Sequence, residues 1–246
     1  MNVYRADLHL HTALSPCGED DMTPQAIARQ ACVMDLDIIA ICDHNTSGNA
    51  AAVQEAAGDA LTVIAGMEIT TAEEVHVVGL FPDVELAHQA STAVLATLPQ
   101  TTPEDTQRFG EQWFLNAHDH VSACETRMLA TAATLDLAET VALIKRCRGL
   151  AIAAHIDRRS FSVLSQLGFL PDDAQFDALE LSAAAVRADR IHEFTRYSLP
   201  LITSSDSHFP EDVGICQTVF SMYAPTFTEV ALAFQRVAGR EVDIST

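Results

Sequence analysis

Short apolar runs alternate along this chain with segments of helical periodicity, and this alternation restricts the fold more than any other feature. Several runs are continuous and rich in isoleucine, leucine and alanine, such as DIIAIC and LAIAAH. Such runs are typical of strands buried on both faces, as in a parallel sheet covered by helices. We therefore expect an α/β fold built from β/α units. The expected strands are Val3–His9, Asp37–Cys42, Leu61–Ala65, Val75–Phe81, Leu150–Ala154, Ala178–Leu181, Pro200–Thr203 and Thr218–Met222.

Helical patterns occupy most of the intervening segments. The pair Thr23-Pro24 opens the first, because threonine caps a helix and proline suits its first position. The other expected helices are Asn49–Ala57, Asp136–Cys147, Ala183–Tyr197 and Thr228–Val237.

One connection is longer than the rest. We expect residues 82–148 to form an insertion after the fourth strand, with a helix at Glu85–Leu98, an irregular loop and a short hairpin near Gln112–Leu115. Residues 1–246, of which 48% are hydrophobic, suffice for one core and are expected to form a single domain.

Composition and charge predict where the protein is located and which partners it binds. No apolar run is long enough to cross a membrane, and the N-terminal residues lack the apolar core of a secretory signal. Six scattered cysteines are typical of reduced thiols, so we expect a cytoplasmic protein without a membrane partner. A net charge of −20 repels nucleic-acid phosphates, so the sequence predicts no extended nucleic-acid surface. A small anionic substrate is compatible with this charge if bound metals make the site positive. The oligomeric state is left open.

His9 and His11 lie in the first expected strand, alternating with Leu8 and Leu10. Side chains in a strand change faces with period two, so both imidazoles should point to one side and both leucines to the other. Two imidazoles at this spacing form a chelating pair for a divalent metal. A second HxH, at His118 and His120, lies among polar turn residues of the insertion and is expected at the surface.

Polar residues also accompany the other expected strands. The carboxyl ends of parallel strands gather at one face of a β/α fold, so these residues should converge. The convergent set is His9, His11, His44, Glu68, His76, His155, Asp206 and His208. Nitrogen and carboxylate ligands without a thiolate cluster suit zinc, manganese or iron. The set is too large for one tetrahedral site and predicts two or three divalent metal ions, with Glu68 or Asp206 bridging.

The segments DLHLHT, CDHNT, GMEIT, VHVVGLF, AAHID and SSDSH occur in this order and at this spacing. The chain thereby resembles the PHP family, named for polymerase and histidinol phosphatase, over residues 3–81 and 149–222. The resemblance implies a distorted (β/α)7 TIM-like barrel with a site for two or three metals that hydrolyses phosphate esters.

The resemblance also implies how the ligands are shared among the metals. His9 and His11 would bind the first metal, with Glu68 bridging and Asp206 completing the shell. His76 and His155 would hold the second metal, and His44 and His208 the third.

A further ligand for the third metal is expected from the turn after His11, where this sequence departs from the shorter form of many relatives. Cys17, Glu19, Asp20 and Asp21 are the candidates. We favour Asp20, with Cys17 as the rival, because two imidazoles on a borderline metal still call for an anionic ligand.

Other residues beside the ligands are candidates for supporting roles. Arg158 or Arg159, which follow His155, could clamp a phosphate. Asp7 and Asp43 precede ligands and are expected either to accept an N–H from a ligating imidazole or to have a plain structural role.

These features predict a metal-dependent phosphoesterase acting on a small phosphate ester. A hydroxide bridging two metals would attack phosphorus, Arg158 would neutralise the phosphoryl oxygens, and a metal-bound water or Asp206 would protonate the leaving oxygen. Two alternatives are a metal-dependent hydrolase of a non-phosphate substrate and a non-catalytic metal-binding regulatory domain.

Overall fold

A sheet of nine strands is the centre of the structure, a computed structural model that describes residues 1–244. The strand order is β11-β10-β1-β2-β3-β4-β7-β8-β9. The strands are β1 (Asn2–Leu10), β2 (Ile38–Ile41), β3 (Thr62–Thr70), β4 (His76–Phe81), β7 (Leu150–Ala153), β8 (Ala178–Leu181), β9 (Leu201–Thr203), β10 (Thr218–Met222) and β11 (Glu241–Asp243). The expected strands are therefore present, and β3 continues past Ala65 to include Glu68.

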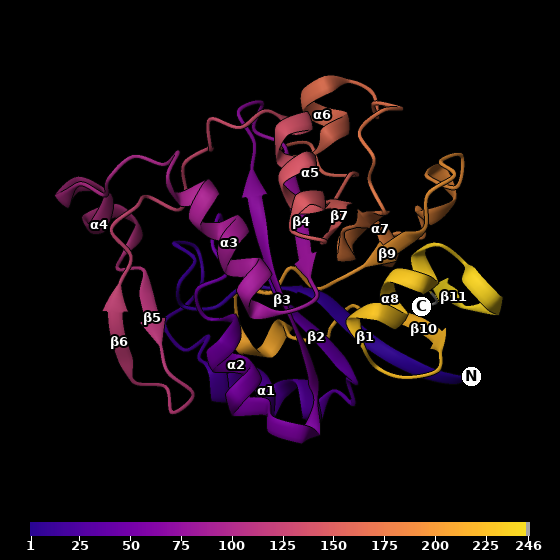
Figure 1. Ribbon diagram of the computed structural model, residues 1–246, viewed down its shortest axis with the longest axis horizontal. Coiled ribbons are helices and arrows are strands. Elements are labelled where there is room, and N and C mark those ends of the chain that lie inside the picture. The colour runs from indigo at the N-terminus through magenta and orange to yellow at the C-terminus, as the bar shows by residue number, and fades with distance from the viewer. Residues whose placement is uncertain (245–246) are drawn as a thin grey trace.

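Helices pack against this sheet (Figure 1). They are α1 (Pro24–Val33), α2 (Ala50–Ala57), α3 (Val84–Leu95), α5 (Leu137–Arg146), α6 (Val163–Leu167), α7 (Ala183–Arg187) and α8 (Phe227–Phe234). One hydrophobic core lies between the sheet and α1, α2, α3 and α5, and a second is made of side chains on the inner face of the strands together with α8. The helix expected to reach Tyr197 ends at Arg187, followed by Asp189 with positive φ. Within residues 1–244, no helix is long and apolar enough to span a membrane.

The strand β4 runs against both of its neighbours. It pairs antiparallel with β3 and with β7, whereas β1–β2, β2–β3, β7–β8 and β8–β9 are parallel. A parallel connection needs a crossover of about a dozen residues, and only a short turn joins Thr70 to His76. The first residue of β4, His76, therefore pairs with Thr70 and lies at the carboxyl end of β3.

The sheet closes on itself at this same end. Beyond β9, Ser207 forms a parallel bridge with Leu10, and its carbonyl accepts a hydrogen bond of 3.0 Å from the His11 N–H. Thr218 of β10 reinforces the closure, because its hydroxyl accepts from the Thr203 N–H and donates to the Thr203 carbonyl. The result is a nearly closed barrel, which agrees with the predicted TIM-like architecture.

A bulge in β1 alters the expected alternation of side chains. The β1–β2 register gains one residue between Asp7 and Leu10. Leu8 belongs to the inner core and Leu10 to the outer one, so the two leucines do not share a face. A bulge adds a residue to one strand and redirects the side chains beside it.

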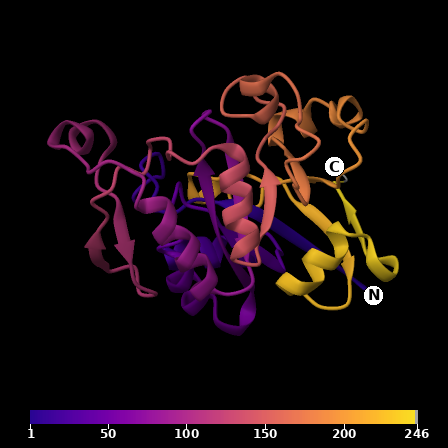
Figure 2. The same cartoon turned by 45° about the horizontal axis from the view of Figure 1, so that its top comes forward.

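Residues 82–148 connect β4 to β7 and carry α3, a short helix α4 (Pro103–Phe109), a hairpin of β5 (Trp113–Leu115) and β6 (Val121–Cys124), and α5. The hairpin is a separate two-stranded sheet. In both ribbon views it extends away from the barrel (Figures 1 and 2). Asn49 anchors it, because its side chain donates to the Trp113 carbonyl and accepts from the Leu115 N–H.

The closure by Thr218 predicts that this residue contributes to the free energy of unfolding. Replacing Thr218 by valine would leave the buried N–H and carbonyl of Thr203 without the hydroxyl that pairs with both. We expect the free energy of unfolding in urea to fall by about 1–3 kcal/mol. Thr92→Val, on an exposed face of α3, should change it by less than about 0.5 kcal/mol. Equal effects of the two substitutions would contradict the proposed role of Thr218.

Candidate metal centre

The mouth of the barrel holds most of the residues that the sequence analysis selected. His9 lies in β1 and Glu68 in β3, and His76 begins β4. The others stand just beyond strands, at His11 after β1, His44 after β2, His155 after β7, and Asp206 and His208 after β9. Residues separated by almost 200 positions therefore meet at one end of the sheet, as the strand-end argument predicted.

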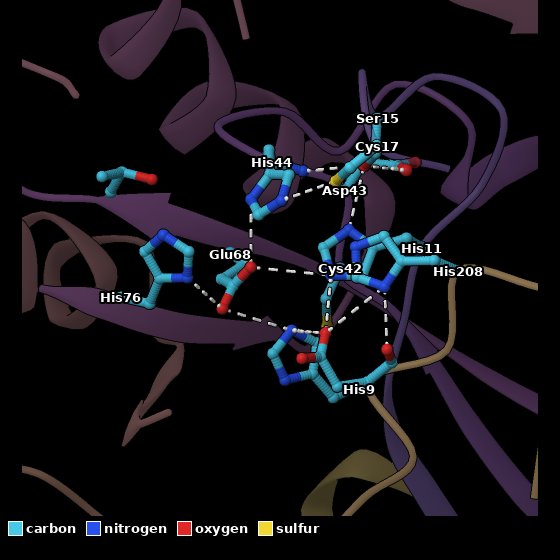
Figure 3. Close-up of polar contacts among 12 residues, drawn as sticks. His9, His11, Ser15, Cys17, Cys42, Asp43, His44, Glu68, His76 and His208 are labelled. Carbon is cyan, nitrogen blue, oxygen red and sulfur yellow. Dashed lines mark hydrogen bonds and ion pairs between the residues drawn. The ribbon is translucent and has the colours of Figure 1, made fainter. Parts of the chain in front are cut away.

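Glu68 is the centre of this arrangement. Its carboxylate lies 2.7 Å from His76 Nδ1, 3.0 Å from His44 Nδ1 and 3.1 Å from His155 Nε2. The Nε2 atoms of His9 and His11 are each 3.5 Å away. Figure 3 shows imidazoles pointing toward Glu68 from several sides. One carboxylate in contact with so many imidazoles has the position of a bridging ligand.

Three overlapping groups of side chains bring donor atoms within 4.8 Å of one another. They are His9, His11, Glu68 and Asp206; His44, Glu68 and His76; and His11, His44 and His208. Glu68 and Asp206 each offer a carboxylate to the first group, where Asp206 Oδ1 lies 3.1 Å from His11 Nε2. Donor groups that share members in this way suit cations held close together.

The electrostatics of the cluster keep its carboxylates ionised. Burial opposes ionisation of Glu68, but the imidazoles of His76, His9 and His44 hold its pKa well below the ordinary value. Asp206 has a lowered pKa because His9 and His11 outweigh its burial. Burial and the neighbouring His208 and His44 lower the pKa of His11 well below its usual range. The ionised carboxylates and the neutral His11 are in the forms that bind metals, whereas burial of His9 and His44 is outweighed by the neighbouring acidic groups, which raise the pKa of both.

Unpaired nitrogens support the same assignment. His155 Nδ1 is buried without a hydrogen-bond partner in the described part of the chain, and His9 Nε2 and His44 Nδ1 face the Glu68 carboxylate without forming a hydrogen bond of good geometry. A buried polar atom without a partner costs free energy, so its presence calls for a ligand. These residues fit divalent transition metals, which accept imidazole nitrogen and carboxylate oxygen together.

The turn after His11 differs from the expectation for Asp20. The Cys17 Sγ lies 3.2 Å from His44 Nε2, whereas Asp20 has no contact with the imidazoles of the cluster within residues 1–244. Both residues are exposed, and neither belongs to the three groups. The turn closed by the Gly18 N–H and the Ser15 carbonyl carries Cys17 over the cluster before the chain leaves the mouth. A Cβ at Gly18 would overlap the Thr12 carbonyl, so this tight turn requires glycine. Burial raises the pKa of the Cys17 thiol, but contacts with His208 and His44 bring it to about 6.

Sequence analysis missed Glu180, which orients His9. Its buried carboxylate accepts from His9 Nδ1 at 3.0 Å and from the His155 N–H at 3.1 Å. It therefore leaves His9 Nε2 facing Glu68. A glutamate inside the buried apolar strand ALEL is a signal that could have identified it, because an unpaired buried charge is costly.

The two aspartates that precede ligands act differently from each other. Asp43 accepts hydrogen bonds of 2.7 Å from the Thr12 N–H and from the Ser15 hydroxyl, and Ser15 Oγ lies 2.9 Å from His11 Nδ1. Asp43 thus reaches an imidazole through Ser15. Asp7 accepts from the backbone N–H groups of Ser205 and Gly214 instead, and burial raises its pKa to about 6.

Of the two adjacent arginines, the structure places Arg158 against the cluster. Its Nη1 lies 2.6 Å from Asp206 Oδ2, and 42% of its side chain is exposed. Arg159 is exposed. A half-exposed guanidinium at the edge of the cluster is in a position to meet an anion entering from solvent.

Comparisons with known proteins agree with this geometry. A family model described as PHP-associated matches residues 191–236. The 5'-3' exoribonuclease Rnm of Salmonella typhimurium is 36% identical over 96 residues, which cover 37% of this chain and 31% of that protein. The Escherichia coli Rnm is 32% identical over 112 residues, covering 43% and 36%. The chain therefore matches about a third of the length of each curated relative.

Solved structures share the fold at lower identity. Endonuclease Q from Pyrococcus furiosus superposes with a TM-score of 0.74 at 21% identity, over 98% of this chain and 58% of that one. A putative metal-dependent phosphoesterase from Bifidobacterium adolescentis gives 0.58 at 21% identity, over 84% and 88%. The resemblance to the PHP family and the distorted TIM-like barrel are thus confirmed.

The same comparisons contradict the partners predicted from charge. The sequence analysis expected a small phosphorylated substrate and no extended nucleic-acid surface. The similar proteins include exoribonucleases and an endonuclease whose structure was solved with a 27-mer duplex. The prediction was wrong because net charge averages over the whole surface, whereas binding depends on the field at the site.

Glu180 provides a test of how the centre is built. Glu180→Ala should weaken metal binding about 10- to 100-fold, because the carboxylate that orients His9 and leaves Nε2 free would be lost. The measurement is a titration of chelator-treated protein with Zn²⁺ or Mn²⁺ against a competing indicator. Glu193→Ala, which removes an exposed carboxylate, is the control. Unchanged affinity in the folded Glu180 variant would refute this role.

Proposed function

We propose that this protein of PHP fold is a metal-dependent hydrolase that cleaves phosphodiester bonds in nucleic acids. The observation that carries the proposal is the buried Glu68 carboxylate, surrounded by imidazoles from several strand ends, with Arg158 paired to Asp206 of the same cluster. The exoribonucleases and the endonuclease among the similar proteins support nucleic acid as the substrate. Those relatives are enzymes by name, in agreement with the prediction of an enzyme.

The residues would hold two cations that share Glu68. His9, His11 and Asp206 would bind one, and His76 and His155 the other. Bound there, zinc, manganese or iron would lower the pKa of water toward neutrality and neutralise charge on the phosphate.

The protein's own side chains have distinct tasks in this scheme. Asp206 stays ionised, since its pKa is lowered, and would act as an anionic ligand rather than as the proton donor. Arg158 would exchange its contact with Asp206 for a phosphate oxygen when substrate enters, because a guanidinium pairs well with a phosphate. Glu180 and Ser15 would keep the imidazoles of His9 and His11 turned toward the centre.

Hydrolysis of end-labelled single-stranded RNA and DNA, with Mn²⁺, Fe²⁺ or Zn²⁺, tests the proposal. We expect metal-dependent cleavage that chelators abolish. Asp206→Asn should lower kcat at least about a hundredfold, because one charged ligand is lost from the site of charge stabilisation. Asp173→Asn, at an exposed position, should leave the rate unchanged.

Two outcomes would contradict this function. Metal-loaded protein that binds the oligonucleotides without cleaving them would instead indicate a regulatory domain. Cleavage that survives in the Asp206 variant at full metal content would show that the reaction occurs elsewhere.

We propose further that a third cation binds between Cys17, His44 and His208. Cys17 Sγ is close to His44 Nε2, and His44 and His208 belong to one donor group. A thiolate there, in place of a carboxylate, would favour softer metals such as zinc.

This third site predicts the reactivity of Cys17. With metals removed, alkylation by iodoacetamide should rise as pH passes about 6, instead of near the ordinary thiol pKa of about 9, because the thiolate is the nucleophile. Bound Co²⁺ should suppress alkylation and give a thiolate-to-cobalt absorption band. Alkylation of the Cys17→Ser variant measures the contribution of the other exposed thiols and is the control. A Co²⁺ spectrum identical in the wild type and the variant would exclude Cys17 as a ligand.

A further inference from the structure

Phe161 is an aromatic ring held beside the metal centre and open to solvent. It follows Arg158 in the loop between β7 and α6, and 40% of its surface is exposed. Its ring stacks on His76, with centroids 4.7 Å apart and planes inclined by 24°. Its carbonyl accepts a hydrogen bond of 2.8 Å from the His76 N–H. The ring is thus fixed to a residue of the centre rather than packed into the core.

The backbone at Phe161 is strained. Its φ is 57°, in the left-handed region that bulky side chains rarely adopt. His155 and Asp206 of the centre also have positive φ, at 29° and 52°. Strain of this kind is costly and clusters at functional sites. A large apolar side chain that is partly exposed, on a strained backbone, calls for a role other than packing in the core.

The loop holds Arg158 and Phe161 in a fixed relation. The Ser162 hydroxyl donates to the Arg158 carbonyl at 2.8 Å, and the Arg158 N–H donates to the His155 carbonyl at 2.9 Å. Ser162 is buried and caps α6, so the turn is anchored at its far end. One short, closed turn therefore presents a cation and an aromatic ring at the edge of the metal centre.

We propose that Phe161 is a stacking platform for a nucleobase next to the scissile phosphate, while Arg158 contacts the phosphate itself. This inference rests on the proposed nuclease function and identifies its substrate as a nucleotide unit with an unstacked base. Aromatic side chains bind single-stranded nucleic acid in this way, because every base has a π-face. His76 covers one side of the Phe161 ring, and 40% of the residue remains exposed and available to a base.

The alternative role is a cover that shields His76 from water. Leucine at position 161 would preserve an apolar cover but remove the aromatic face, whereas tryptophan would retain both. Phe161→Leu and Phe161→Trp therefore separate stacking from shielding. Phe169→Ala, at an exposed phenylalanine after α6, is the matched control.

The test compares a short single-stranded oligonucleotide with versions that carry one abasic residue on either side of the cleaved bond. In the wild type and the Phe169 variant, removing one of the two bases should lower kcat/KM about tenfold, equivalent to about 1.4 kcal/mol. Phe161→Leu should abolish this difference between the intact and the abasic substrate. Phe161→Trp should keep the difference.

A binding measurement adds a readout independent of turnover. In Phe161→Trp combined with Trp113→Phe, which removes the chain's one native tryptophan, the intact oligonucleotide should quench fluorescence more than the abasic one. Equal quenching by the two oligonucleotides would overturn the proposed stacking platform. An equal fall in kcat/KM for the intact and the abasic substrate in Phe161→Leu would overturn it too. If no oligonucleotide is cleaved or bound by the wild type, the proposed nuclease function itself fails, and the stacking platform fails with it.

Discussion

One buried carboxylate governs the architecture of this protein. Glu68 is 1% exposed, and burying such a charge is tolerable only when opposite charges or metal ions compensate it. The compensation comes from imidazoles supplied by several separate strand ends, so the barrel must close for the site to exist. Closure through Ser207 brings Asp206 and His208 beside His11, and the reversed strand β4 brings His76 to Glu68. Fold and site therefore depend on the same contacts.

Much of this arrangement could be predicted from the sequence because its signals are local. Apolar runs located the strands, and the spacing of His9 and His11 indicated a chelating pair. The direction of β4 could not be predicted by the same reasoning, since a strand pattern carries no direction. His76 reached the expected place nevertheless, because it begins β4 rather than ending it.

The residues that sequence reasoning missed depend on contacts across the barrel. Glu180 faces His9 over 171 positions of sequence, and nothing local to its strand indicates that partner. The sequence named both Cys17 and Asp20 as candidates, and the proximity of Cys17 to His44 depends on a tight turn that only the folded loop reveals. Total charge likewise misled the prediction of partners, because the acidic surface says little about a site where imidazoles, Arg158 and cations would face the substrate.

The central claim is that the mouth of the barrel is a multinuclear metal centre built around Glu68. Elemental analysis of protein purified without oxygen or chelators, combined with anomalous diffraction at the metal edges, tests it most directly. The account predicts at least two metal ions per chain, with peaks on either side of the Glu68 carboxylate. One metal ion or fewer per chain under saturating metal, or peaks remote from Glu68, would contradict it.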